Sequence, residues 1–249
     1  MRVRTQPFDV HTYEVDAFHA LAVPALAGYL QDAAGLQAAE MGCGIDELRE
    51  RGLTWVLSRQ RIEVRRLARL GDALKVETWP SGVERVFALR EFRVTRGDGT
   101  LIARASTHWA VMALEKRRPV RPDRVLAPEF HLAAERELPP AEDLPPLDQA
   151  DEERRFWIRY SDIDQNLHVN NTSYLAWALE SVPREVWRDC ATLSADVHFL
   201  AECTYGSRIL SRVRARTDRD FLHSIVREED GKELARVGTR WAPRPELEG

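Results

Sequence analysis

Three polar side chains recur at every second position in the stretch DIDQNLHVNN: Asp164, Asn166 and His168. An imidazole exchanges protons near neutral pH, and a carboxamide can orient a neighbour or hold an oxyanion. A carboxylate can orient the histidine, activate water or attack a carbonyl itself. Alternate residues of extended backbone point the same way, so we expect the three to share one face. Such a set is typical of acyl transfer.

The four residues NNTS, from 170 to 173, open an apolar run and are good helix N-cap types. A helix N-terminus presents backbone N–H groups that suit a developing negative charge. We expect Asn170 and Asn171 to cap a helix here and to flank an oxyanion site. Because capping requires one such residue, it does not account for the three polar residues upstream.

The chain reads as two similar halves on either side of a proline-rich segment, residues 133–151. Each half runs from an extended piece through an apolar helix into four alternating strands. The expected elements are 7–15, 23–42, 53–64, 73–80, 85–94 and 101–114, then 155–161, 170–183, 192–200, 207–217, 221–229 and 233–243. An apolar helix is best buried against the concave face of a curved antiparallel sheet. The pattern predicts an α+β fold, a tandem double hotdog, with domains at 1–132 and 152–249.

The duplication provides an internal comparison for the polar residues. When Tyr29 is superposed on Tyr174, the three residues of DIDQNLHVNN fall opposite His19, Leu21 and Val23. The first half then lacks the polar set, which a purely structural role would require in both halves.

A second superposition, through Gly71 and Gly206, adds a fourth residue. Glu202 falls on Leu67, so a carboxylate replaces an apolar residue in the second half only. Cys203, which falls on Ala68, reads either as a small buried residue or as a thiolate nucleophile paired with the histidine.

The runs SDIDQNLHVNNTSYLAWALESVP and AECTYG resemble the signature of the acyl-acyl-carrier-protein thioesterases of plant plastids and bacteria. GLTWVLSRQRIEV, GDALKVETWP and ARASTHWAVM resemble the amino-terminal hotdog of that family. The resemblance implies hydrolysis of fatty acyl-acyl-carrier protein, which releases a free fatty acid, without metal or cofactor. It implies catalytic roles for Asp164, Asn166, His168 and Glu202, with Cys203 accessory, and it assigns the acyl-chain pocket and carrier docking to the first domain.

The resemblance leaves three mechanisms open. Asp164 or Glu202 attacks or activates water while Asn166 and His168 hold it, His168 is the general base, or Cys203 is the nucleophile. Because a thioester is already activated, a positioned base and an oxyanion donor can suffice, so we favour water or carboxylate chemistry.

The charge pattern indicates which kinds of partner the chain could bind. Lys and Arg number 36 against 40 Asp and Glu, and the net charge of −4 gives no support to nucleic-acid binding. A cluster of arginines is either a solvated strand face or a dock for an acidic partner: Arg61, Arg65, Arg66 and Arg69. The resemblance implies that this partner is acyl carrier protein, which is acidic and bears a phosphopantetheine arm.

The remaining expectations concern location and assembly. No apolar run approaches the ~18 residues that span a bilayer, the start has no secretory h-region, and the three cysteines form no disulfide framework. We expect a cytoplasmic bacterial protein, either a monomer or a homodimer paired through edge strands.

Three other functions fit the same fold. One is an acyl-CoA thioesterase, which differs in its carrier. Another is a non-catalytic module that binds acyl thioesters, although such a module does not explain a polar set confined to one half. The third is a hydratase, which would act on enoyl substrates.

Overall fold

The computed structural model describes residues 3–140 and 143–247. The chain divides into two compact units, Met1–Pro140 and Ala141–Gly249. Positions 141 and 142 of the expected linker, and the chain ends of the two expected domains, lie outside the described residues. No helix in the described ranges is long and apolar enough to cross a lipid bilayer.

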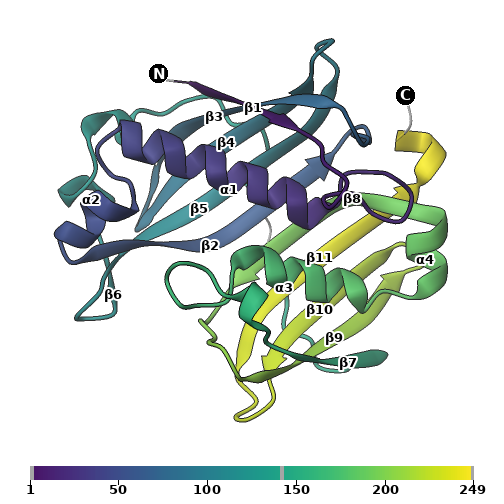
Figure 1. Cartoon of the computed structure of the whole chain (residues 1–249). Coiled ribbons are helices and arrows are strands. Elements are labelled where there is room, and N and C mark those ends of the chain that lie inside the picture. Colours follow the sequence, from purple (N-terminus) through teal and green to yellow (C-terminus); the bar gives the residue numbers. More distant parts are fainter. Residues whose placement is uncertain (1–2, 141–142, 248–249) are drawn as a thin grey trace. The chain divides into compact units, whose positions relative to one another are not determined.

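Unit 1 is one long helix, α1 (Val23–Glu40), lying against an antiparallel sheet (Figure 1). The strands in spatial order are β1 (Arg4–Asp9), β3 (Ala73–Glu84), β4 (Phe87–Arg96), β5 (Leu101–Ala113) and β2 (Leu53–Val64). Four short elements complete the unit: α2 (Ile45–Glu50), β6 (Arg118–Val120) and the 3₁₀ turns Pro122–Arg124 and Pro128–His131.

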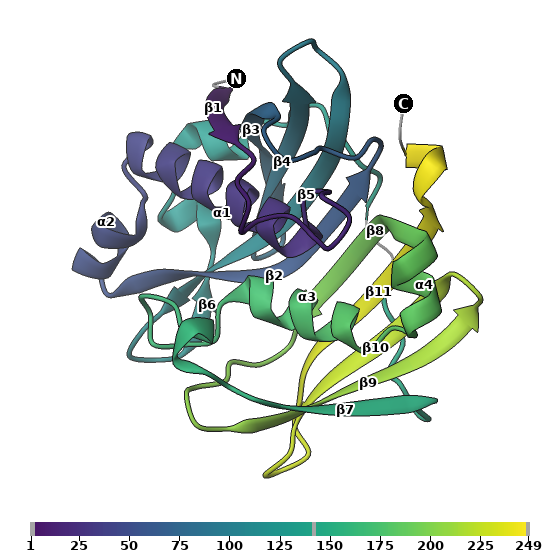
Figure 2. The ribbon, with the colours of Figure 1, turned by 45° about the vertical axis from the view of Figure 1, so that its right-hand side comes forward.

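Unit 2 repeats the plan with α3 (Asn171–Glu180), which contacts β8 to β11 (Figure 2). Its antiparallel strands in spatial order are β8 (Cys190–Phe199), β11 (Glu233–Pro243), β10 (Asp220–Arg227), β9 (Arg208–Thr217) and β7 (Glu152–Trp157). The short helix α4 (Arg184–Asp189) and the 3₁₀ turns Tyr160–Asp162 and Arg244–Leu247 complete it. The predicted α+β class, with one helix against a sheet in each half, is confirmed.

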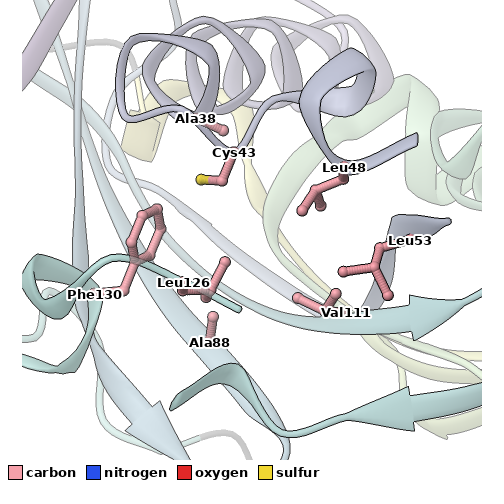
Figure 3. Close-up of a cluster of buried hydrophobic side chains, with 8 residues drawn as sticks. All are labelled: Ala38, Cys43, Leu48, Leu53, Ala88, Val111, Leu126 and Phe130. Atoms are coloured by element: carbon pink, nitrogen blue, oxygen red, sulfur yellow. The ribbon is translucent and has the colours of Figure 1, made fainter. Parts of the chain in front are cut away.

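One apolar cluster of the unit 1 core forms where α1 ends and α2 begins. Figure 3 shows the residues that meet there: Ala38, Cys43, Leu48, Leu53, Ala88, Val111, Leu126 and Phe130. Burial raises the pKa of the Cys43 thiol to about 11, so this cysteine behaves as a small apolar residue.

The first part of the proline-rich segment, residues 133–140, is bonded to unit 1. The Trp79 indole N–H donates to the Glu135 carbonyl at 3.0 Å. The buried Glu137 carboxylate pairs with Arg93 and with Arg104, the latter at 3.1 Å. These contacts fix the segment on the sheet face opposite α1.

The second part of the same segment belongs to unit 2. Leu144 and Leu147 form a buried cluster with Leu222 of β10, and the Asp151 carboxylate accepts from the Ala215 backbone N–H at 2.8 Å. The apolar residues scattered among the prolines therefore contribute to folding.

His223 of β10 is fully buried and makes the stability of unit 2 sensitive to acid. Its Nε2 lies 3.0 Å from Thr239 Oγ1, and within the described ranges its Nδ1 has no hydrogen-bond partner. Burial lowers the pKa of His223 from 6.5 to about 3. Below pH 6.5, His223 therefore binds a proton in the unfolded chain and remains neutral in the folded chain. We expect the free energy of unfolding to fall as the pH drops below 6.5, at a rate that approaches about 1.4 kcal/mol per pH unit between about pH 5.5 and 4 on this account.

Urea titrations across this pH range measure the effect. His223→Gln is expected to flatten the pH dependence, whatever it does to stability at pH 7. The matched control is His19→Asn, because His19 is exposed and asparagine tolerates its positive φ of 62°. Parallel curves for wild type and His223→Gln would contradict the assignment.

Candidate active site

The polar residues of DIDQNLHVNN lie in a tight turn. The Asp164 N–H donates to the His168 carbonyl at 2.8 Å, and the Leu167 N–H donates to the Asp164 carbonyl at 3.0 Å. Leu167 has φ 62°, and Ile163 bridges Val169. The expectation of extended backbone is therefore wrong, and the turn sets the directions of the side chains.

The Asp164 carboxylate shapes this turn. Its Oδ1 accepts from the backbone N–H groups of Asn166, at 2.8 Å, and of His168, at 3.3 Å. Its Oδ2 accepts from the Asn166 carboxamide at 3.2 Å. Asp164 therefore holds the backbone of the turn and orients the Asn166 side chain, as Asx-type turns do.

His168 meets Glu202, which comes from the segment after β8. The distance from His168 Nε2 to Glu202 Oε2 is 3.7 Å, and the two side chains are 36% and 39% exposed. A carboxylate beside one imidazole nitrogen orients the ring and favours a proton there. The pair is suited to general base chemistry on a group that arrives from solvent.

Asn170 caps α3, as the sequence predicts. Its side-chain oxygen accepts from the Thr172 backbone N–H at 3.0 Å, and Asn171 is the first residue of the helix. The Asn170 N–H donates to the Asp162 carbonyl at 2.8 Å. The start of α3 is thereby tied to the turn that carries Asp164 and His168.

The segment that carries Glu202 is anchored on both sides. The Leu200 and Ala201 N–H groups donate to the Leu234 carbonyl at 2.8 and 3.1 Å, and the Val169 N–H donates to the Cys203 carbonyl at 2.9 Å. Cys203 itself is 1% exposed.

Two residues that the sequence did not single out lie within electrostatic range of Cys203. Burial, with Cys203 and Glu202 nearby, raises the pKa of the Tyr174 phenol, and Asp230 and Cys203 are among the groups that raise the pKa of Arg227. In the sequence, Tyr174 reads as part of the apolar helix stripe, and Arg227 precedes a hairpin turn. Neither position carries a signal that links it to Cys203.

Unit 1 contains the same turn without the asparagine and the histidine. The Asp16 N–H donates to the Ala20 carbonyl at 2.7 Å. The Asp16 carboxylate accepts from the backbone N–H groups of Phe18, at 2.9 Å, and of Ala20, at 3.0 Å. His19 has the φ of 62° that Leu167 has in unit 2.

The superposition through Tyr29 and Tyr174 is therefore wrong by three residues. The expected counterparts His19, Leu21 and Val23 are incorrect. The counterparts of Asp164, Asn166 and His168 are, in order, Asp16, Phe18 and Ala20. The first half thus keeps the aspartate and lacks the asparagine and the histidine. A slip of three residues passes unnoticed in a helix because positions three apart lie on one face.

The superposition through the two glycines is confirmed. Gly71 and Gly206 have φ values of 86° and 89°. The Leu21 N–H donates to the Ala68 carbonyl at 2.9 Å, just as the Val169 N–H donates to the Cys203 carbonyl in unit 2. Leu67 therefore takes the place of Glu202.

The four expected docking arginines differ in their surroundings. Arg61 and Arg65 both pair with Glu63, at 2.8 and 2.7 Å, and Arg69 donates to the Phe18 carbonyl at 2.7 Å. A hollow of about 400 Å³ is lined by Arg65, Arg66, Thr100, Leu101 and Arg104. Of the four, Arg65 and Arg66 line this hollow, together with Arg104, which also pairs with Glu137.

In the described ranges, no three His, Cys, Asp or Glu side chains are grouped as ligands of a metal ion.

Two family models match the chain in succession. The acyl-ACP thioesterase N-terminal domain matches residues 2–128 and the acyl-ACP thioesterase C-terminal domain matches residues 146–243. A chloroplastic acyl-[acyl-carrier-protein] hydrolase of Cuphea viscosissima is 29% identical over 258 residues, and a chloroplastic palmitoyl-acyl carrier protein thioesterase of Cuphea hookeriana is 30% identical over 259 residues. Each match covers 96% of this chain and 62% of the relative, so the chain spans less than two thirds of their length.

Two solved structures are similar over nearly the whole chain. An acyl-ACP thioesterase from Bacteroides thetaiotaomicron has a TM-score of 0.86 and 26% identity, with 96% of this chain and 98% of that chain covered. A 12:0-ACP thioesterase from Umbellularia californica has a TM-score of 0.87 and 25% identity, with 97% of each chain covered.

Proposed function

This chain belongs to the acyl-ACP thioesterase family, and from that premise we propose that it hydrolyses fatty acyl-acyl-carrier protein to a free fatty acid and the carrier thiol. The observation that carries the proposal is the meeting of His168 and Glu202 at 3.7 Å, beside a turn that orients Asn166. The two groups come from separate segments of unit 2, and unit 1 has Ala20 and Leu67 in their places.

In the proposed mechanism, His168 is the general base and Glu202 orients it. With Nε2 turned toward Glu202, Nδ1 accepts a proton from water. The water oxygen bonds to the thioester carbonyl carbon, and the carbonyl electron pair moves to oxygen. Asn166 and the first turn of α3 stabilise that oxyanion. Collapse then breaks the C–S bond, and the proton on His168 passes to the departing thiolate.

The geometry supports positioning roles for the other two candidates. Both oxygens of Asp164 accept hydrogen bonds within the turn, so we assign it to orienting Asn166. Cys203 is 1% exposed, whereas a reactive thiolate requires access to the substrate. We therefore assign neither residue the role of nucleophile.

We further propose a division of labour between the domains. Residues 152–249 contain every candidate catalytic residue. Residues 1–132 hold the cationic hollow and are assigned to carrier docking and to the acyl chain. This assignment is consistent with the loss of chemistry from the turn around Asp16.

The same acyl group presented on acyl carrier protein and on CoA tests the function. We expect release of free fatty acid from both carriers, with the higher kcat/KM for the carrier protein. A preference for CoA would identify an acyl-CoA thioesterase, and binding without release would identify a non-catalytic module.

Charge reversal in the hollow distinguishes an effect on carrier docking from an effect on the hydrolysis step. Arg65→Glu combined with Arg66→Glu is expected to lower kcat/KM for acyl-ACP by about 10-fold at low salt, because surface charges act mainly on association. Hydrolysis of acyl-CoA should remain unchanged, and added salt should shrink the difference.

The control is Arg118→Glu combined with Arg121→Glu, which makes the same change of net charge at another exposed place in unit 1. Equal losses for the two double variants would show a general effect of net charge and would remove the assignment of docking to the hollow.

A further inference from the structure

We propose that exposed apolar side chains on the segments that carry His168 and Glu202 form a rim on which acyl carrier protein binds during the reaction. The inference rests on the proposed function and names the surface that the carrier covers. The rim consists of five side chains: Trp157, Tyr160, Leu167, Leu200 and Tyr205. They are five of the six large apolar side chains that are exposed in the described part of unit 2.

The rim residues belong to three segments that backbone hydrogen bonds join beside the catalytic pair. The Ile158 N–H donates to the Ser207 carbonyl at 3.1 Å, and the Val169 N–H donates to the Cys203 carbonyl at 2.9 Å. The first bond ties the end of β7 to the segment that carries Glu202, and the second ties the candidate catalytic turn to the same segment. A partner that brings a thioester to the exposed imidazole therefore approaches segments that each present apolar side chains.

Leu167 is the rim residue whose backbone conformation costs free energy. It has φ 62° and is 76% exposed, and leucine is uncommon in the left-handed region. Because the side chain is exposed, packing within the chain offsets little of this cost. The equivalent residue of unit 1 is His19, which also has φ 62°, and histidine is enriched in this conformation. Such backbone outliers cluster at functional sites, and a partner that buries the leucine would offset its cost.

The positions of the rim are mostly polar in unit 1. The His11 N–H donates to the Glu14 carboxylate at 2.8 Å, and the Arg159 N–H donates to the Asp162 carboxylate at 2.7 Å. These equivalent bonds, together with the two equivalent glycines, align the segments. The counterparts of the rim in unit 1 are, in order, Asp9, Thr12, His19, Arg65 and Leu70. Unit 1 thus forms the same helix and sheet with one apolar residue at these five positions, so the fold does not require the rim.

The composition of the rim suits a protein partner. Three of its five side chains are tyrosine or tryptophan, and the guanidinium of Arg208 lies 5.4 Å from the centre of the Trp157 ring. Aromatic residues and arginine are enriched at protein interfaces. Acyl carrier protein is the protein that must approach His168 in the proposed reaction. The rim acts differently from the hollow, because surface charges act mainly on association and buried apolar contacts slow dissociation.

Tyr160→Ser combined with Leu167→Asn tests the proposal. We expect the Kd for holo-acyl carrier protein, which bears the arm without an acyl group, to rise about 10-fold, since two side chains lose their burial in the contact. The ratio of kcat/KM for acyl-ACP to kcat/KM for acyl-CoA should fall by a similar factor. Added salt should leave this loss unchanged, in contrast to the loss from charge reversal in the hollow.

Leu167→Asn alone separates binding from folding. Asparagine tolerates a positive φ better than leucine does, so the variant should unfold at a higher urea concentration than wild type while it binds the carrier more weakly. A leucine that served the fold would give lower stability on substitution, and that result would overturn its place in the rim.

The matched control is Tyr13→Ser combined with Leu114→Ser, which removes an exposed tyrosine and an exposed leucine from unit 1. It should leave carrier binding and the ratio of kcat/KM values unchanged. Equal losses for acyl-ACP and acyl-CoA in the rim double variant would overturn the inference, because the rim would then bind the arm or acyl group that both substrates share.

Two further results would assign the rim to another occupant and overturn the inference. One is unchanged carrier binding with a loss of cosedimentation with phosphatidylethanolamine–phosphatidylglycerol vesicles, which would identify a membrane surface. The other is unchanged carrier binding with a change from dimer to monomer in sedimentation velocity, which would identify a second copy of the chain.

Carrier binding also separates this inference from the proposed function. Weaker binding of holo-acyl carrier protein by the double variant, in a protein that hydrolyses no acyl thioester, would retain the role of the rim and refute the function. Unchanged carrier binding by the double variant of an active enzyme would refute the role of the rim alone.

Discussion

His168→Ala is expected to lower kcat for acyl-ACP hydrolysis by about 10³-fold, because general base catalysis contributes about 10²- to 10⁴-fold. The imidazole is 36% exposed and 3.7 Å from Glu202, so its removal takes away the base without opening a cavity in the core. KM should change little, since the histidine acts on water and not on the acyl chain. Free fatty acid release under single-turnover conditions measures the chemical step.

The control for this variant is His11→Ala, which removes an exposed imidazole from unit 1. Its kcat should match wild type. Hydrolysis by His168→Ala within about threefold of wild type would place the base elsewhere, with Glu202 the next candidate.

Asp164→Ala is expected to lower both activity and stability. The change leaves two backbone N–H groups without their acceptor and frees the Asn166 carboxamide. We expect a loss of about 10²-fold in kcat and about 1–3 kcal/mol in the free energy of unfolding. Urea denaturation and steady-state kinetics measure the two effects.

The duplicated turn supplies the control that separates them. Asp16→Ala removes the same two acceptor bonds in unit 1, so it should cost similar stability and leave kcat unchanged. Asp164→Asn should keep much of the activity if the side chain only orients the turn. An Asp164→Asn variant as inactive as Asp164→Ala would show that the carboxylate itself takes part in the reaction.

Most strands could be predicted from sequence because they contain stretches in which apolar and polar residues alternate. The prediction of 53–64 coincides with β2, and 233–243 coincides with β11. The short elements α2, α4 and β6 were missed, since six residues or fewer show no period. The first strand lies at Arg4–Asp9 and not at 7–15, because the residues after Asp9 form the turn around Asp16.

The candidate site was less accessible to sequence than the fold. The two glycines gave the right superposition because a positive φ restricts the residue type at one position. The two tyrosines gave the wrong one because a buried helix accepts many apolar residues on the same face. The pairing of His168 with Glu202 could not be measured from sequence, since it joins a turn and a loop that are distant in the chain.

The turn around Asp16 has a consequence for the history of the chain. Three substitutions distinguish unit 1 from unit 2 at the chemistry-bearing positions of this turn and of the segment that faces it: Phe18 for asparagine, Ala20 for histidine and Leu67 for glutamate. None of the three touches the bonds that form the turn. After a duplication, the catalytic centre of unit 1 could therefore be lost through these three substitutions without loss of the turn, while selection for folding preserved the aspartate. Asp16 is then retained only because its carboxylate stabilises the turn.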